Sequence, residues 1–483
     1  MKQIEWNRIA QEYGTPTYVF DVRIMCDRIR RIRELLPGGT KLCFAMKANP
    51  FLAGAIADEV DRLEVCSPGE YEICIREHVD PDKIVISGVN KTEASIRRIL
   101  EYSKGAGIYT IESELHYEIL KQCAMDMGCR LQVLLRLSSG NQFGMDQAVL
   151  EQVLTKIIED DVVDVAGIHF YSGTQKKMEK VEHELTFLAE YGEHLRREYR
   201  LEDIELEYGP GLMVSYFQNE KKMVPKAEEE DGQLSELSRL LQAQTTFSGV
   251  SIELGRFLAY DCGYYMTRIM DKKCTDDTGF VIVDGGIHQL NYYGQMMGMK
   301  QPYMELIPMK EREKVSETTE AVCSKWTICG SLCTVNDVIV RQVELPHFET
   351  GDVVLFERCG AYAVTEGMAL FLSRELPQVL LINQEGTVCV QRPITQINIL
   401  NGWRKRTMEE LIEILEEILP GEDVENCKTL IDDHILNSFG ILSLVSEIED
   451  AFEVEVSPAE LIPDNFNSAE ALWNMICRLK EDN

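Results

Sequence analysis

Between about residues 40 and 256, polar side chains stand where short β-rich runs end, and their types suit one kind of chemistry. A lysine at such an end is a surface charge, a phosphate ligand or an amine for imine formation. Glycines in a turn facing the same side offer backbone N–H groups to a phosphate. Together with a carboxylate that keeps a pyridinium nitrogen protonated, these groups suit pyridoxal phosphate. The residues at the run ends are Lys47, Ser67, Asn90, Glu112, Arg136, His169, Tyr171, Gly209-Pro210-Gly211, Glu253 and Arg256.

A second candidate lies close to the C-terminus, in the stretch LNSFGILSL. Its polar pair, Asn437-Ser438, precedes apolar residues at helical spacing: Phe439, Leu442, Val445 and Ile448. This spacing places Ser438 at or near the start of a helix. Serine is a common helix N-cap, so a structural cap is one interpretation of the hydroxyl.

The elements that must position the first set alternate regularly. Helix-like stretches separate eight β-rich runs, which are KLCFAMKA, RLEVCS, KIVISGV, GIYTIES, RLQVLLRLS, VVDVAGIHFYSG, DIELEYGPG and FSGVSIELG. Eight such units predict an α/β fold, a (β/α)₈ barrel, whose strands carry chemistry at their C-terminal ends. A doubly wound open sheet is the alternative. The charged span 218–236 is expected to be a surface insertion before the last barrel strand.

Beyond Tyr260 the sequence pattern changes. The chain is rich in β-like runs and poor in helical patterns to about Pro393, which predicts a mostly β domain. The rest, from TMEELIEILEEILPG onward, is helical and acidic and follows a polar hinge, LNGWRKR.

Length and charge limit the number of domains and the kinds of partner to be expected. A chain of 483 residues requires two to four domains. Its net charge of −32 argues against a nucleic-acid partner. From Thr407 onward there are 20 acidic and 3 basic residues, so over half of the excess charge lies in the last 77 residues.

The cysteines and the hydropathy pattern suggest a compartment. No spacing among the fifteen cysteines resembles a zinc site or a small disulfide framework, and many lie in apolar runs as buried small side chains. No apolar run is long enough for a membrane helix, and the N-terminus lacks a secretory signal. We therefore expect a cytoplasmic protein that binds neither a metal nor a membrane.

Motifs along residues 10–395 resemble the fold-type III pyridoxal-phosphate amino-acid decarboxylases, the group of diaminopimelate and ornithine decarboxylases. They are YGTPTYVFD, FAMKANP, GIHFYSGTQ, YGPG, ELGR, CGSLCTVND and CGAY. The resemblance implies that Lys47 binds the cofactor covalently and that Cys333 is a catalytic thiol supplied by the second subunit of a homodimer. It also implies a cofactor-binding set of Lys47, His169, Tyr171, Gly209, Gly211, Glu253, Gly255, Arg256 and Tyr362. Glu253 would face the pyridine nitrogen, and Arg256 would lie near the phosphate or a substrate carboxylate.

The chain departs from the family pattern in informative places. Tyr171 stands where the family usually has a histidine stacked on the cofactor ring, and Gln142 replaces a frequent lysine. The ELGR motif lacks the usual proline. Relatives that act on diamino acids carry an acidic residue after the cysteine to pair with the distal ammonium, whereas this chain has the uncharged Thr334. Because an unpaired buried ammonium is costly, ornithine, lysine and diaminopimelate are poor candidate substrates.

The C-terminal part, residues 407–483, resembles an acyl carrier protein, which implies an all-α four-helix bundle. In this motif the serine that opens the second helix receives 4′-phosphopantetheine, which implies attachment at Ser438. Carriers usually have aspartate before that serine, and here it is Asn437. The negative surface suits a carrier that meets partner enzymes by charge.

The resemblances predict a domain order. Residues 1–26 join the β domain, 27–260 form the barrel and 261–395 form the β domain. A linker at 396–406 leads to the carrier domain at 407–483.

Together the two resemblances constrain the substrate. A decarboxylase of this type needs a free α-amino group and a free α-carboxylate, so a carrier must hold the amino acid through a second carboxyl group. We therefore expect a decarboxylase in specialised metabolite biosynthesis that acts on glutamate or aspartate held as a side-chain thioester. A phosphopantetheinyl transferase and an amino-acid ligase would prepare the carrier. The alternatives are a decarboxylase of a free amino acid whose amine is later joined to an acyl group on the carrier, and an inactive cofactor-binding or scaffold protein.

Overall fold

The computed structural model describes residues 4–218, 227–275, 278–292, 298–310, 323–401, 407–452 and 454–481. It divides into two compact units, residues 1–397 and 398–483. No helix of the described ranges is both long and apolar enough to cross a membrane.

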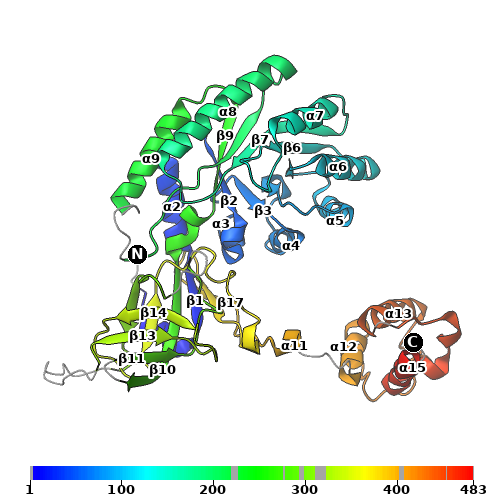
Figure 1. The fold of residues 1–483 in the computed structure, drawn as a ribbon. Helices are drawn as coiled ribbons and strands as arrows, with labels where there is room; N and C mark the ends of the chain where they lie inside the picture. Colours follow the sequence, from blue (N-terminus) through cyan, green and yellow to red (C-terminus); the bar gives the residue numbers. More distant parts are fainter. Residues whose placement is uncertain are drawn as a thin grey trace. The chain divides into compact units, whose positions relative to one another are not determined.

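The first unit contains a closed barrel of eight parallel strands (Figure 1). The strands are β2 (Lys41–Ala45), β3 (Arg62–Val65), β4 (Ile84–Ile86), β5 (Ile108–Ile111), β6 (Leu131–Arg136), β7 (Val163–Tyr171), β8 (Glu205–Gly209) and β9 (Gly249–Leu254). Pairing of β2 with β9 closes the ring, which confirms the predicted barrel and excludes the open sheet.

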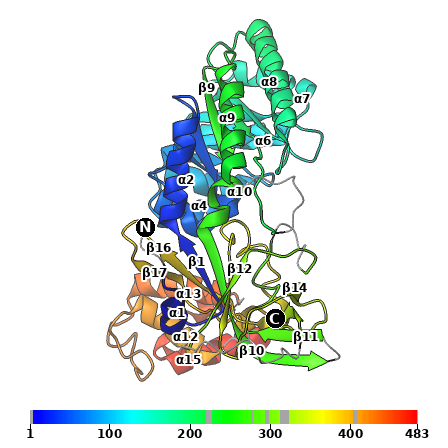
Figure 2. The ribbon, with the colours of Figure 1, turned by 90° about the vertical axis from the view of Figure 1, so that its left-hand side faces the viewer.

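Helices surround the barrel strands, and most of them carry one apolar stripe toward the sheet. They are α2 (Val22–Leu35), α3 (Ala53–Ile56), α4 (Pro68–Arg76), α5 (Glu93–Ser103), α6 (Glu114–Met127), α7 (Gln147–Ile158), α8 (Met178–Tyr199), α9 (Ala227–Gln242) and the short α10 (Arg256–Ala259). Helix α2 precedes the first barrel strand and packs against both α3 and α9, so it completes the outer ring (Figure 2).

The predicted surface insertion at 218–236 is wrong for its second half. Residues 219–226 lie outside the described ranges, but α9 begins at Ala227 and packs against α2 and α8. Leu234 and Leu237 are buried in the main core. Two of the charged residues that suggested an insertion, Glu230 and Asp231, form ion pairs with Arg28 and Arg31 of α2.

The second part of this unit is a nine-stranded sheet, built of β1 (Thr17–Asp21), β10 (Gly263–Thr275), β11 (Thr278–Val283), β12 (Met304–Ile307), β13 (Lys325–Cys329), β14 (Val338–Val343), β15 (Val353–Phe356), β16 (Gln378–Ile382) and β17 (Val388–Arg392). β1 lies between β10 and β16, so the N-terminal segment contributes a central strand. The short helix α1 (Trp6–Glu12) packs on this sheet through Ile9 and Ala10. The prediction of a mostly β domain is confirmed.

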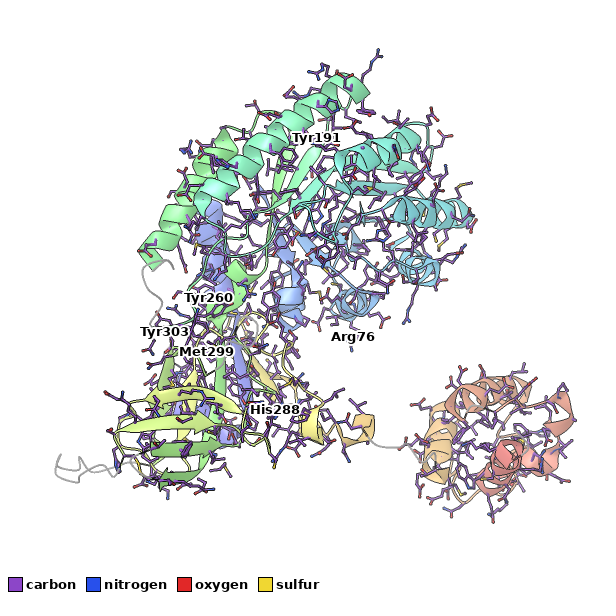
Figure 3. All side chains as sticks on the ribbon, viewed as in Figure 1. Arg76, Tyr191, Tyr260, His288, Met299 and Tyr303 are labelled. Carbon is purple, nitrogen blue, oxygen red and sulfur yellow. A yellow bond between two sulfur atoms is a disulfide. The ribbon has the colours of Figure 1, made fainter. Side chains whose placement is uncertain are left out.

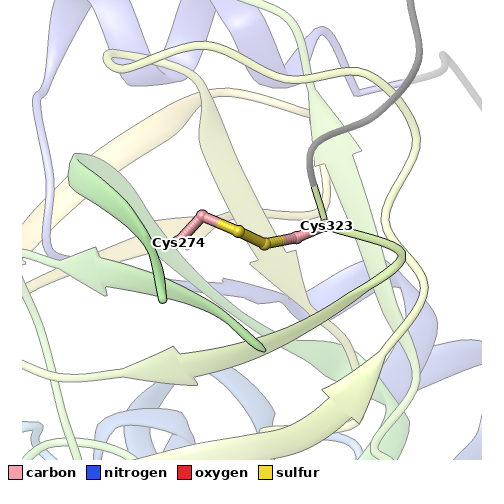
Figure 4. Close-up of a disulfide and its surroundings, with 2 residues drawn as sticks. All are labelled: Cys274 and Cys323. Carbon is pink, nitrogen blue, oxygen red and sulfur yellow. A yellow bond between two sulfur atoms is a disulfide. The ribbon is translucent and has the colours of Figure 1, made fainter. Parts of the chain in front are cut away.

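A cation–π contact joins the sheet to the barrel, and a disulfide cross-links two segments of the β domain. The guanidinium of Arg358 lies 3.7 Å from the ring centroid of Tyr303 and 5.9 Å from that of Tyr260, both labelled in Figure 3. Cys274, at the end of β10, forms a disulfide with Cys323 (Figure 4). The sequence did not predict this bond, because 49 residues separate the two cysteines and only the folding of the sheet brings them together.

The second unit consists of helices around its own apolar core. They are α11 (Asn398–Asn401), α12 (Met408–Ile418), α13 (Ser438–Phe452), the four-residue α14 (Pro463–Phe466) and α15 (Ala469–Glu481). α12 packs against α13 and α15, and the core includes Leu415, Leu444, Phe452 and Leu472. Residues 402–406 of the predicted hinge lie outside the described ranges.

Candidate active site at the mouth of the barrel

Lys47 lies just beyond the C-terminal end of β2, in a single 3₁₀ turn (Met46–Ala48). Its Nζ lies 2.9 Å from Glu64 Oε2 and 3.5 Å from Glu253 Oε1, and its side chain keeps 34% of its surface exposed. Burial lowers the pKa of Lys47, but the two carboxylates outweigh it and raise the pKa well above the ordinary value. In this structure the amine is therefore held as an ammonium paired with two carboxylates.

Glu253, one residue before the end of β9, connects Lys47 to His169. Its Oε2 lies 3.1 Å from His169 Nε2, and both side chains are buried. Burial raises the pKa of Glu253, but the charge of Lys47 and the hydrogen bond with His169 overcome this and hold it well below its ordinary range. The group is a fixed carboxylate, as required to face a cationic ring nitrogen.

Tyr171 and two glycines shape the opposite wall. The Lys47 Nζ lies 5.7 Å from the centroid of the Tyr171 ring. A Cβ on Gly209 would lie 2.4 Å from Tyr171 Cδ2, and a Cβ on Gly211 would lie 2.2 Å from the carbonyl oxygen of Gly173. Gly211 also has a φ of +57°, so only glycine fits both positions without movement of the backbone or the ring.

Tyr362 brings the β domain to the same place. It follows β15 with a φ of +67°, and its backbone N–H donates to the carbonyl oxygen of Ala48 at 2.6 Å. A left-handed aromatic residue is strained, and such strain gathers at functional sites. The guanidinium of Arg256 lies 4.4 Å from the Tyr362 ring centroid and donates to the Tyr216 hydroxyl at 2.9 Å.

The cavity is lined by Lys47, Tyr171, Glu253, Arg256 and Tyr362, together with Gly211 and Gly255. At Gly255 a Cβ would lie within 3.3 Å of the Ala45 and Ala48 methyl groups, so β9 and β2 approach closely there. A lysine amine, a buried carboxylate, an aromatic wall, a glycine turn and an arginine converge on the cavity, and this donor set fits pyridoxal phosphate. When bound, that cofactor supplies an electron sink for the bonding pair released at an amino-acid Cα.

Other predicted strand-end residues have structural partners instead. The Ser67 hydroxyl caps α4 by accepting from the Glu70 N–H, and Glu112 pairs with Arg136 at 3.1 Å. Cys333 and Thr334 lie on an exposed turn of the β domain. Within the described part of the chain, the lining of the Lys47 cavity includes neither Cys333 nor Thr334.

Three neighbours of the site were missed by the sequence reasoning. Glu64 makes the shortest contact with Lys47, the Cys66 thiol lies 3.8 Å from the same Nζ, and Tyr216 binds Arg256. Glu64 could have been found, because a carboxylate inside a buried β-rich run, RLEVCS, points into a barrel. Tyr216 follows the glycine turn in a loop without a pattern that would predict its direction.

The barrel, the added sheet and the lysine-centred site define a class, the barrel-type pyridoxal-phosphate enzymes. A family model described as "Pyridoxal-dependent decarboxylase, C-terminal sheet domain" matches residues 17–360, most of the chain. The chain belongs to this family and is a pyridoxal-phosphate-dependent amino-acid decarboxylase.

Curated relatives agree with this assignment. The chain is 26% identical over 407 residues to the L-glutamyl-[BtrI acyl-carrier protein] decarboxylase of Niallia circulans, covering 79% of this chain and 92% of the relative. It is 27% identical over 387 residues to the diaminopimelate decarboxylase of Pseudomonas aeruginosa, covering 74% and 85%.

Solved structures show the same fold. Diaminopimelate decarboxylase from M. jannaschii matches with a TM-score of 0.69 at 22% identity, over 83% of this chain and 94% of that one. The Helicobacter pylori enzyme complexed with L-lysine matches with a TM-score of 0.67 at 20% identity, over 82% and 98%.

Proposed function

We propose that this decarboxylase removes the α-carboxylate of glutamate or aspartate while the amino acid is held, as a side-chain thioester, on the chain's own C-terminal unit. The thioester would join a 4′-phosphopantetheine arm attached to Ser438. The reaction needs a free α-amino group and a free α-carboxylate, so only the side-chain carboxyl is left for the tether. The product would be a 4-aminobutyryl or β-alanyl thioester.

The observation that carries the proposal is the start of helix α13. The helix begins at Ser438, but the side chain of Asn437 accepts the N–H of Gly440 at 2.9 Å and so serves as the N-cap. A cap is therefore already present without the Ser438 hydroxyl. A helix N-terminus also favours a phosphodiester, because its backbone N–H groups and dipole attract negative charge.

Two further points support the same substrate. The Niallia circulans relative is named for decarboxylating a glutamyl group on an acyl carrier protein. Thr334, next to Cys333, offers no charge to a distal ammonium, which agrees with a neutral thioester at that end. A phosphopantetheinyl transferase and an amino-acid ligase would then be the partners that prepare the carrier.

The cavity residues receive the following roles in this proposal. Lys47 binds the cofactor covalently, Glu253 faces its ring nitrogen with His169 behind it, and Tyr171 lies against its ring. The N–H groups at the Gly209–Gly211 turn, with Tyr362, hold its phosphate. Gly255 allows the close approach that places Arg256, which binds the phosphate or the substrate carboxylate.

Cys333 would act in the site of a second subunit. Its turn is tied to the segment 366–374, because Arg374 Nη2 donates to the carbonyl oxygen of Ser331 at 2.7 Å. Apolar side chains stand exposed on both pieces: Val335, Met368, Leu370, Phe371 and Leu372. A second copy of the chain would cover them, since exposed apolar clusters of this kind mark interfaces.

The experiment compares the full chain with its Ser438→Ala variant after treatment with a phosphopantetheinyl transferase, a loading ligase and candidate amino acids. We expect CO₂ release and the matching mass loss on the carrier in the wild type only. The variant should keep its bound cofactor and, because Asn437 remains as the cap, nearly all of its stability. Asn437→Ala should instead cost about 1 kcal/mol.

A separately supplied loaded carrier should restore turnover to Ser438→Ala. The proposal is wrong if the variant decarboxylates free glutamate or aspartate as fast as the loaded wild type processes its thioester. That outcome would favour the free amino acid as substrate and leave Ser438 without a carrier role.

A further inference from the structure

Two segments that follow neighbouring barrel strands interlock behind the glycine turn. The backbone N–H of Lys176, after β7, donates to the carbonyl oxygen of Gly211, after β8, at 2.8 Å. The Gln175 side chain accepts the Val214 N–H at 2.8 Å and donates to the Val214 carbonyl at 2.9 Å. The position of residues 209–214 is therefore fixed by the segment that carries Lys176.

The side chain of Lys176 is buried directly beneath the turn, with 3% of its surface exposed. Its Nζ donates to Glu184 Oε2 at 2.7 Å, to the Gly209 carbonyl oxygen at 2.9 Å and to Ser172 Oγ at 3.2 Å. A Cβ on Gly211 would lie 2.8 Å from Lys176 Cε, so the lysine stem lies next to Gly211 while its ammonium binds Gly209.

The same ammonium lies close to the cofactor side of the site. Lys176 Nζ is 6.0 Å from the centroid of the Tyr171 ring, which Lys47 Nζ approaches at 5.7 Å. Both ammonium groups therefore lie close to the same aromatic ring. Burial lowers the pKa of Lys176 and the pairing with Glu184 raises it, so Glu184 offsets part of the cost of burying this charge.

Glu184 sets the charge balance of this region. Its Oε2 also accepts from the Tyr208 hydroxyl at 2.7 Å, and its other oxygen accepts from the Ser172 hydroxyl. Burial raises the pKa of Glu184, but Lys176 and these hydroxyls lower it below its ordinary value, so the group is a carboxylate. Without the lysine charge, a buried anion would stand behind a turn that must accept a phosphate dianion.

We propose that Lys176 is a positioning residue for the cofactor phosphate: it holds the Gly209–Gly211 turn from behind and neutralises Glu184, so that the turn accepts a dianion. This inference rests on the proposed use of the turn for the phosphate. It concerns binding of the phosphate alone and gives Lys176 no part in bond breaking.

The test uses two probes, pyridoxal phosphate and pyridoxal, which differ only in the phosphate. Binding to apo full-length chain is followed by absorbance, and borohydride reduction with peptide mapping identifies the attachment site. Lys176→Met should bind pyridoxal phosphate at least about ten-fold more weakly, a loss typical of one charge-assisted contact, and pyridoxal within about two-fold of wild type. Lys176→Gln, which keeps a donor for Gly209 without the charge, should shift in the same direction and decides the matter if the Met variant does not fold.

Lys180→Met is the matched control. Lys180 lies one turn further along the chain and 3.7 Å from the same Glu184, but 55% of its side chain is exposed. We expect wild-type binding of both probes.

Each other outcome has one meaning. Equal losses for pyridoxal and pyridoxal phosphate, or no loss for either, would refute the role of Lys176 while leaving the proposed function intact. Failure of the wild type itself to bind pyridoxal phosphate, or a reduced adduct on a lysine other than Lys47, would instead overturn the proposed site.

Discussion

At the scale of single residues, the site gathers charged and polar side chains, most of them buried, at the mouth of the barrel. Lys47, Glu64, Glu253 and His169 form a continuous chain of contacts between 2.9 and 3.5 Å. Apolar side chains of similar volume would usually be at least as stable, so charges of this kind indicate a binding or catalytic role. The same reasoning separates Lys176 from the many exposed lysines.

His288, labelled in Figure 3, is a buried histidine outside the site. Neither ring nitrogen has a hydrogen-bond partner within the described residues. Burial, assisted by the charge of Arg374, lowers its pKa to about 4. Asp337 lies near His288, on the turn that follows Cys333. The side chains of both residues lie against the backbone of Gly286.

This depressed pKa predicts a pH dependence of stability. The unfolded chain binds the His288 proton below about pH 6.5 and the folded chain only near pH 4, so stability is present above 6.5 and is lost as the pH falls. At pH 5 the loss amounts to about 2 kcal/mol. In His288→Leu the difference in unfolding free energy of the 1–397 unit between pH 7.5 and 5.0 should shrink by that amount.

The exposed His183 supplies the control for this measurement. His183→Leu should retain the full wild-type pH dependence. If His288→Leu retains it as well, His288 takes up its proton in the folded state and is not held neutral.

At the scale of elements, the sequence predicted the barrel strands because alternating β-rich and helical runs carry a strong periodic signal. It missed α9, since AEEEDGQLSE is locally polar and contains one leucine, Leu234, while the other leucines that pack, Leu237, Leu240 and Leu241, follow it. It could not predict the Cys274–Cys323 bond, whose partners meet only through sheet pairing.

The site divides in the same way. Lys47, Glu253 and Gly211 stand at or near strand ends within recognisable motifs, so the sequence alone predicted that they would lie at the barrel mouth, and they line one cavity. Cys66 and Lys176 reach the site through contacts between elements that no local spacing reveals, whereas Glu64 could have been inferred from its place inside a buried β-rich run.

Helix α9 provides a test at this scale. Leu237 is fully buried, so Leu237→Ala should lower the unfolding free energy of the 1–397 unit by about 2–5 kcal/mol. Arg239, two residues on, is more than half exposed in its ion pairs with Glu236 and Glu182, and Arg239→Ala should cost about 0–1 kcal/mol. If denaturant titrations gave equal and small losses of unfolding free energy for both variants, the segment would be a surface insertion after all.

At the scale of the whole molecule, the chain combines an enzyme unit and a small acidic helical unit that folds around its own core. If the second unit carries the substrate as proposed, joining the two in one chain would raise the concentration of the tethered amino acid at the barrel to roughly millimolar for a short flexible connection. Under that proposal the enzyme need not bind a free amino acid tightly, and the uncharged Thr334 is no handicap.

The exposed turn of Cys333 makes the last prediction one about assembly. In a homodimer with shared sites, a protomer carrying Lys47→Ala and one carrying Cys333→Ala each lack one group, and each homodimer is inactive. A heterodimer regains one site that holds both Lys47 and Cys333, so purified heterodimers should show roughly half of the wild-type turnover per dimer. A different affinity tag on each protomer allows the heterodimer to be isolated, and mass spectrometry of its carrier unit then detects the product. If Cys333 instead served its own protomer, no site in the heterodimer would be complete, and verified heterodimers would show no recovery.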